Sequence, residues 1–436
     1  MTRLTHLLKP VFFIFFCTVC YSQQVNEYID LQIHTTMHVP YPFFGKGLEF
    51  FDEKNPPSLS YKHQFNNVNY ANFFKENRGV RIICNGSLNM EYISDPKKAR
   101  KTILKQIDYV NKFAEDHADL FVVAKTPQQV REYLQTTDKT IIIHCIEGGK
   151  ELIKSQEDAN FWAAQGVSFI TLIHLVDCEY GGAAVLPGLP TRIINMDASC
   201  DTQTEIGLTE QGKNAIIWLA NAGIMTDITH MNDRTRKDAL QVMEEYGIPP
   251  LSTHDGFKPI QNHPRALDRE DIVNIYQNNG FMALPISGYS CMPYQPETAY
   301  QQKIDSLDLY CEGSIDSYIF TYQVVKDFIE TNPQLGYADS LSEKEKVNYC
   351  IGFQSDFNGW LNHSRPRYGT EGCYATVPDS VTEPIETQGL AHPGLLESQW
   401  KVMEQEGVDL APVKRAAEKF LQMWQYFLDN RGKFGK

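Results

Sequence analysis

The chain has 436 residues, of which 42% are hydrophobic and 22% are charged, and its formal net charge is −14 at pH 7. This length allows one large α/β barrel with insertions or two medium domains. The acidic balance argues against nucleic acid and anionic membrane surfaces as partners. No apolar run beyond the first twenty-odd residues is long enough to predict a transmembrane span.

The first 22 residues have the pattern of a secretory signal peptide. Arg3 and Lys9 precede the apolar run 11–20, and Ser22 and Gln23 offer a cleavage point. We therefore expect an exported protein, periplasmic or secreted, with one mature domain over residues 23–436. Export permits disulfides, but the spacing of the cysteines does not pair them. The mature chain keeps Cys84, Cys145, Cys178, Cys200, Cys291, Cys311, Cys350 and Cys373.

Eight short apolar runs predict strands, and helical patterns separate most of them. Continuous apolar runs are typical of parallel strands, which are buried on both faces. Strands are predicted at 28–34, 79–84, 140–149, 167–174, 223–230, 247–254, 280–285 and 349–356. Helices are predicted at 96–118, 156–165, 208–221, 232–246 and 412–430.

This alternation predicts an α/β fold, a (β/α)₈ TIM-like barrel with long loop insertions. Such barrels usually have about 250 residues, so the chain has residues to spare. We expect the extra length in loops at 41–74, 180–206, 292–346 and 358–393.

The segment 223–254 predicts one β-α-β unit with a histidine at each strand exit. Parallel strands joined by a helix end at the same edge of a sheet, so His230 and His254 should converge. A histidine alone is more often a hydrogen-bonded structural residue than a metal ligand. Other candidate ligands also fall at the ends of predicted strands, where barrel active sites lie. Imidazole and carboxylate side chains there predict a zinc-type site, and the residues are Gln32, His34, Glu147, His174, His230, His254 and Asp356.

Seven segments together resemble the membrane (renal) dipeptidase family of the amidohydrolase superfamily, in order and roughly in spacing. They are Cys-Ile-Glu147-Gly-Gly, Phe-Ile-Thr-Leu-Ile-His174, Gly207-Leu-Thr-Glu-Gln-Gly-Lys, Gly223-Ile-Met-Thr-Asp-Ile-Thr-His230, Leu-Ser-Thr-His254, Pro264-Arg265-Ala and Ile-Gly-Phe-Gln-Ser-Asp356-Phe-Asn-Gly359. The resemblance implies that Glu147 bridges two zinc ions and that His230 and His254 complete one of the two sites.

The chain departs from the family pattern on the first strand. The family has a His-x-Asp pair where this chain has Gln32 and His34. Glutamine is a neutral amide and a poor zinc ligand, so we expect one or two zinc ions per chain. In the first site, His38 or His144 could supplement His34.

The resemblance also implies how a substrate is bound and cleaved. It makes His174 a contact to the substrate and to the tetrahedral intermediate, and Arg265 the holder of the substrate's C-terminal carboxylate. Asp356 would transfer a proton. The expected activity is hydrolysis of dipeptides or related amides by metal-activated water, and the family resemblance suggests a homodimer.

Two other hypotheses stay open. A degenerate, metal-poor barrel could bind a peptide or carboxylate ligand without catalysis, and Gln32 supports that alternative. Long insertions could also reshape the pocket for a different substrate. The polar C-terminal residues 430–436 do not predict the lipid anchor carried by animal members of the family.

Overall fold

The computed structural model describes residues 24–40, 74, 79–91, 95–184, 206–286, 292–359 and 361–435. Eight parallel strands close into a barrel, with the hydrogen-bonded order β2-β1-β9-β8-β7-β6-β5-β4 and a β2–β4 pairing that completes the ring. The strands are β1 (Ile29–Ile33), β2 (Ile82–Leu88), β4 (Thr140–Glu147), β5 (Val167–Thr171), β6 (Met225–Asp227), β7 (Leu251–Ser252), β8 (Phe281–Pro285) and β9 (Gly352–Gln354). The predicted (β/α)₈ barrel is confirmed.

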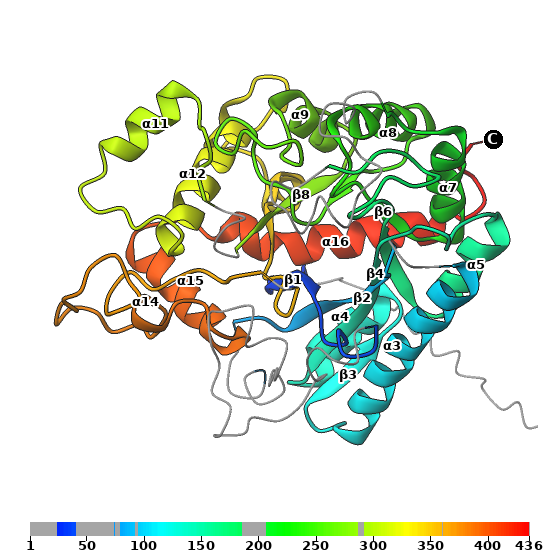
Figure 1. Ribbon diagram of the computed structural model, residues 1–436, viewed down its shortest axis with the longest axis horizontal. Coiled ribbons are helices and arrows are strands. Elements are labelled where there is room, and N and C mark those ends of the chain that lie inside the picture. Colours follow the sequence, from blue (N-terminus) through cyan, green and yellow to red (C-terminus); the bar gives the residue numbers. More distant parts are fainter. Residues whose placement is uncertain are drawn as a thin grey trace, which may run out of the picture.

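Helices surround this ring (Figure 1). Those of the barrel layer are α3 (Pro96–Asp116), α5 (Gln156–Ala164), α7 (Glu210–Ala222), α8 (Asp233–Tyr246), α9 (Arg269–Gln277), α12 (Ile315–Thr331) and α16 (Ala411–Asp429). Local sequence sets their limits: Asn232 accepts the Thr235 N–H at 2.8 Å to cap α8, and Gly247, at φ 64°, ends it. Phe420 of α16 packs against Phe169 of β5, with ring centroids 6.1 Å apart.

The structure also contains elements that the sequence did not predict, α9 among them. A ninth strand, β3 (Phe121–Ala124), pairs with the first half of β4 and is followed by α4 (Pro127–Thr136). The expected loop at 292–346 is largely helical, because α11 (Thr298–Asp305), α12 and α13 (Glu343–Lys346) lie in it. Figure 1 shows α11 projecting from the body of the barrel.

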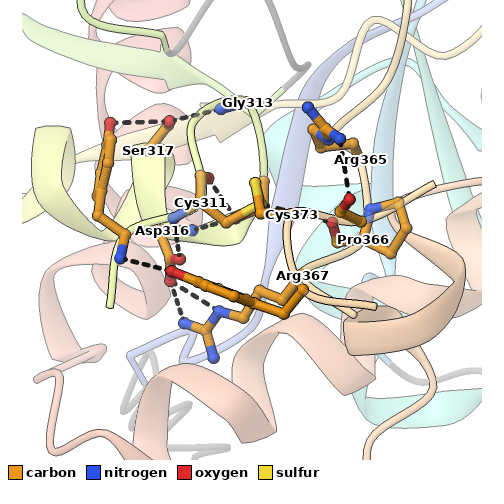
Figure 2. Close-up of a disulfide and its surroundings, with 12 residues drawn as sticks. Cys311, Gly313, Asp316, Ser317, Arg365, Pro366, Arg367 and Cys373 are labelled. Carbon is orange, nitrogen blue, oxygen red and sulfur yellow. Dashed lines mark hydrogen bonds and ion pairs between the residues drawn. A yellow bond between two sulfur atoms is a disulfide. The ribbon is translucent and has the colours of Figure 1, made fainter. Parts of the chain in front are cut away.

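The insertion after β9 is anchored to the segment before α12. It carries α14 (Ile385–Gln388), and α15 (Leu396–Gln405) follows it. A disulfide joins Cys311 to Cys373 across the two segments, and Arg367 forms an ion pair with Asp316 beside it (Figure 2). Arg367 also forms an ion pair with Glu386.

Several predictions fall outside the described residues: the signal peptide, almost all of 41–74 and most of 180–206. Among the helices that the structure describes, none combines the length and the apolar character that a bilayer crossing requires.

Candidate metal centre

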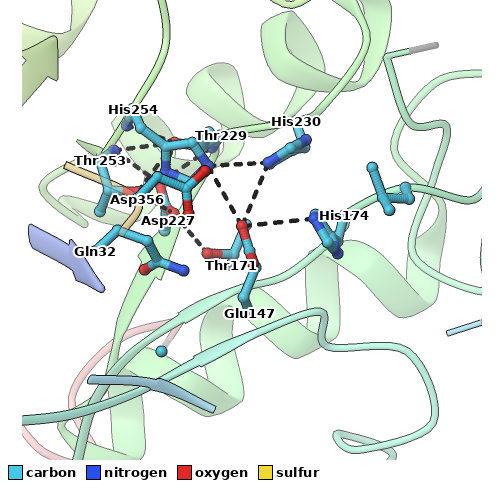
Figure 3. A network of polar contacts seen from close by, with 12 residues as sticks. Gln32, Glu147, Thr171, His174, Asp227, Thr229, His230, Thr253, His254 and Asp356 are labelled. Carbon is cyan, nitrogen blue, oxygen red and sulfur yellow. Dashed lines mark hydrogen bonds and ion pairs between the residues drawn. The ribbon is translucent and has the colours of Figure 1, made fainter. Parts of the chain in front are cut away.

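Four predicted site histidines meet at Glu147, the last residue of β4. Its Oε1 lies 3.4 Å from Nε2 of both His230 and His254 and 3.5 Å from Nε2 of His174. Its Oε2 lies 3.1 Å from Nε2 of His34. All five side chains are buried at the carboxyl ends of barrel strands, and Figure 3 shows Glu147 at the centre of the contacts with His174 and His230. The sequence therefore identified a cluster that the fold assembles from distant segments.

The predicted convergence of His230 and His254 is confirmed. Their Nε2 atoms are 2.9 Å apart. His230 follows β6 with φ 70°, in the left-handed region that non-glycine residues seldom adopt. Such conformations cost free energy and persist where surrounding contacts enforce them, which is common at functional sites.

Glu147, His230 and His254 form a group that could hold a metal ion. Each offers one ligand atom, and the three atoms lie within 4.8 Å of one another. Two imidazole nitrogens and a carboxylate are a zinc-type donor set that leaves a further position for water or substrate. Three atoms with lone pairs point at one buried spot, where they repel one another unless a cation or a proton lies between them. The residues present therefore fit a divalent ion.

The electrostatics of Glu147 and His230 favour the forms that bind a metal ion. Burial, reinforced by Arg265 and His174, holds the pKa of His230 well below its usual value. Burial opposes ionisation of Glu147, but the neighbouring histidines, His174 and His34 first, outweigh it and hold the carboxyl pKa well below its usual range. The pKa of His174 falls to about 4 because burial outweighs the attraction of Glu147. His174 is therefore neutral at pH 7.

The second oxygen of Glu147 faces the first strand. Nε2 of His34 lies 3.2 Å from Asp356 Oδ1 and 3.3 Å from Nε2 of Gln32, and His34 Nδ1 donates to the Gly86 carbonyl at 2.9 Å. Gly86 has no room for a Cβ, which would lie 2.6 Å from the Gln32 amide nitrogen. Gln32 thus presents its amide nitrogen to His34. An amide nitrogen donates hydrogen bonds and does not bind metal ions.

The prediction that His38 or His144 supplements His34 in this half of the site is wrong. Nε2 of His144 bonds the side chain of Asn111 on α3 at 3.0 Å. The ring of His38 packs edge-on against Tyr109, also on α3, with centroids 4.6 Å apart. Side chains alternate along a strand, so His144 must face the helical layer when Glu147, three residues later, faces the barrel interior.

Arg265 lies beside the cluster. Its Nη2 donates to the carbonyl of His254 at 2.9 Å, and its Nε lies 3.3 Å from Asp255 Oδ1. Asp255 is itself fixed by the Ser252 hydroxyl at 2.9 Å. These bonds hold the guanidinium next to a candidate metal ligand and do not use Nη1.

Sequence reasoning missed two acidic residues behind the site. Glu91 accepts the N–H of Leu175 at 3.1 Å, directly after His174, and that of Lys150 at 3.4 Å; burial raises its carboxyl pKa to about 8. Asp227 ends β6 and accepts hydrogen bonds from threonines on three strands or their exits. For Asp227 the available signal was a carboxylate inside a buried strand.

Known proteins resemble this chain in sequence over part of its length. An uncharacterized dipeptidase of Schizosaccharomyces pombe is 26% identical over 188 residues, covering 42% of this chain and 41% of that protein. Dipeptidase 3 of Mus musculus is 21% identical over 228 residues, covering 50% and 42%. The chain thus spans less than half the length of these curated relatives.

Solved structures share the barrel. A dipeptidase described as a metallopeptidase of family M19 superposes with a TM-score of 0.61 at 14% identity, covering 92% of this chain and 98% of that one. A Rhodobacter sphaeroides metallopeptidase, solved with a phosphinate mimic of the dipeptide L-Ala-D-Ala, gives 0.59 at 14% identity, covering 92% and 99%. The sequence model of the membrane dipeptidase family, peptidase family M19, matches residues 50–312. This match covers more than half of the chain, which therefore belongs to the membrane dipeptidase family.

Proposed function

We propose that the chain is a metal-dependent dipeptidase whose ion is zinc, held by Glu147, His230 and His254. The observation that carries this proposal is the grouping of these three ligand atoms within 4.8 Å at the carboxyl end of the barrel. A zinc ion bound there supplies Lewis acidity and lowers the pKa of water to about 7, which makes hydroxide available at neutral pH.

The chain's own residues perform the remaining tasks. His174 is neutral at pH 7 and its Nε2 lies 3.5 Å from Glu147 Oε1, so it can donate a hydrogen bond to an oxyanion that develops at the cluster. Arg265 can bind a free C-terminal carboxylate through its terminal nitrogens, as a planar donor suits. Asp356 can accept a proton from the attacking water and pass it to the leaving amine. Binding the carboxylate so close to the cluster favours dipeptides over longer chains.

The proposal requires one ion and allows a second beside His34. The second half of the site has His34, Asp356 and Glu147 Oε2, and a neutral amide stands where the family has a histidine. A single ion with three protein ligands is sufficient for hydrolysis.

We also propose that the protein acts outside the cytoplasm. The leader-like residues 1–22 and the disulfide between Cys311 and Cys373 support this. Homodimer formation stays a prediction.

The experiment measures metal content by elemental analysis and hydrolysis of a dipeptide panel on purified protein. The panel contains L-Ala-L-Ala, L-Ala-D-Ala and the C-terminal amide of each. We expect at least one zinc per chain and turnover of the free dipeptides, with the amides cleaved poorly. Glu147→Gln should lose both metal and turnover, whereas Arg265→Met should keep the metal and raise KM for the free dipeptides. If Glu147→Gln kept its metal and its activity, the proposed site would be wrong.

A second candidate rests on Gln32, whose amide nitrogen faces His34. A metal-poor barrel could bind a peptide or carboxylate ligand without catalysis. Wild-type protein that holds no metal and shows no turnover, even after zinc is added back, would favour this candidate.

A further inference from the structure

Asp227 is a fully buried carboxylate that accepts five hydrogen bonds, none from a cation (Figure 3). Oδ1 accepts the Thr229 N–H at 3.1 Å, the Thr229 hydroxyl at 2.6 Å and the Thr253 N–H at 3.1 Å. Oδ2 accepts the hydroxyls of Thr171 and Thr253, each at 2.7 Å. The anion is therefore held by dipoles from β5 and from the exits of β6 and β7.

The Thr253 hydroxyl links this carboxylate to His254. Its Oγ1 lies 2.7 Å from Asp227 Oδ2 and 2.7 Å from His254 Nδ1, and it has one hydrogen to donate. An ionised carboxylate can only accept, so Thr253 donates to Asp227 and accepts from His254. The reverse arrangement would place two oxygens with lone pairs 2.7 Å apart without a hydrogen between them.

We propose that Asp227 and Thr253 are positioning residues that fix His254 as the Nδ1–H tautomer. The lone pair then lies on Nε2, which faces Glu147 Oε1 at 3.4 Å. This inference rests on the proposed function, because it assigns the network to the support of a metal ligand. Supporting residues of this kind change metal affinity by about 10- to 100-fold when they are removed.

The other histidine of the group lacks such support. Nδ1 of His230 is buried and has no hydrogen-bond partner among the described residues. The two ligands therefore differ: His254 is held in one tautomer by a carboxylate and a hydroxyl, whereas His230 is held through its backbone turn. The Thr253 hydroxyl contacts His254 Nδ1, so removing that hydroxyl should affect metal binding through His254.

The test is the zinc affinity of the metal-free full chain at pH 7, measured by competition with a chelating fluorophore. Thr253→Val is nearly isosteric and removes only the hydroxyl; we expect the Kd for zinc to rise by about 10- to 100-fold. Thr253→Ser restores the hydroxyl and should return the Kd to within about threefold of wild type. Thr226→Val is the matched control, because the Thr226 hydroxyl is buried on β6 without a hydrogen-bond partner among the described residues.

Asp227→Asn tests the direction of the hydrogen bonds. The two backbone N–H groups keep the amide oxygen at the Oδ1 position, so the amide nitrogen takes the Oδ2 position and donates to Thr253. Thr253 must then donate to His254 Nδ1, which moves the imidazole proton to Nε2 and blocks that ligand atom. We expect a loss of zinc affinity at least as large as that of Thr253→Val.

Each outcome bears on one statement. Wild-type zinc affinity of Thr253→Val would overturn the inference, whether or not the thermal unfolding of the metal-free protein changes. A rise in Kd that Thr253→Ser does not reverse would also overturn it, since a hydroxyl would not be the cause. If Asp227→Asn does not fold, the valine and serine pair still decides. Wild-type protein that binds no zinc would instead refute the proposed function, so the two failures are distinguishable.

Discussion

Arg236 of α8 is fully buried and ties together the two loops that follow β6 and β7. Its Nε donates to Asp271 at 2.9 Å and its Nη2 to Asp233 at 2.5 Å. Nη1 reaches the Met231 carbonyl at 3.3 Å and Nη2 the Ala266 carbonyl at 3.2 Å, and both residues directly follow predicted site residues. Arg236→Met would leave Asp271 buried without its cation, a change that costs about 3–5 kcal/mol.

The expected fall in melting temperature follows from the size of the chain. Unfolding entropies near 2.1 cal/mol/K per residue give about 0.9 kcal/mol/K for this chain, so Arg236→Met should lower the Tm by about 3–6 °C. The matched control is Arg269→Met. Arg269 also makes two bonds to a carboxylate, at 2.7 and 2.6 Å to Glu297, but the two side chains are 43% and 49% exposed.

The exposed pair should contribute less than about 1 kcal/mol, which corresponds to a shift of about 1 °C. Thermal unfolding of metal-free protein, followed by circular dichroism, measures both variants under the same conditions. If Arg236→Met lowered the Tm no more than Arg269→Met, the argument that burial makes the loss of this guanidinium expensive would be refuted.

Three further predictions concern the disulfide, acid stability and Asp356, the proposed proton-transfer residue. The Cys311–Cys373 bond spans 62 residues, so Cys373→Ser should lower the free energy of unfolding by about 4 kcal/mol in denaturant titrations. Burial lowers the pKa of His144 to about 4 in the folded protein, and unfolding restores it to about 6.5. The unfolded chain therefore binds a proton more readily, so the contribution of His144 to the free energy of unfolding is full above about pH 6.5 and falls as the pH drops toward 4. His144→Gln should remove about 3 kcal/mol of this pH dependence, measured as the difference between the two unfolding profiles. A Cβ at Gly359 would lie 2.0 Å from Asp356 Oδ1, so Gly359→Ala should lower kcat by about 100-fold with unchanged metal content.

The barrel strands could be predicted because their burial leaves a strong pattern. Strands packed on both faces require long apolar runs, and β4 shows this as Thr-Ile-Ile-Ile-His-Cys-Ile-Glu. β3 was missed because its pattern is short and no candidate site residue marks its exit, whereas a histidine follows each of the still shorter β6 and β7. The Thr126-Pro127 pair after it was a usable signal, since a threonine cap followed by proline is typical of a helix start.

The site could be predicted in part because a parallel barrel brings all strand exits to one edge. That rule placed His230 and His254 together without knowledge of their neighbours. It could not give the role of Asp227, because the direction of each hydrogen bond depends on hydroxyls from three separate segments. It could not pair Cys311 with Cys373 either, since eight cysteines allow 105 complete pairings.

The departure on the first strand and the family membership are compatible because Glu147 divides the site. Its Oε1 faces His174, His230 and His254, which come from the exits of β5, β6 and β7. Its Oε2 faces only His34 of the first strand among the ion-pair contacts of the described residues. A glutamine on β1 therefore alters the Oε2 half and leaves the donors of the Oε1 half, and the network behind His254, unchanged.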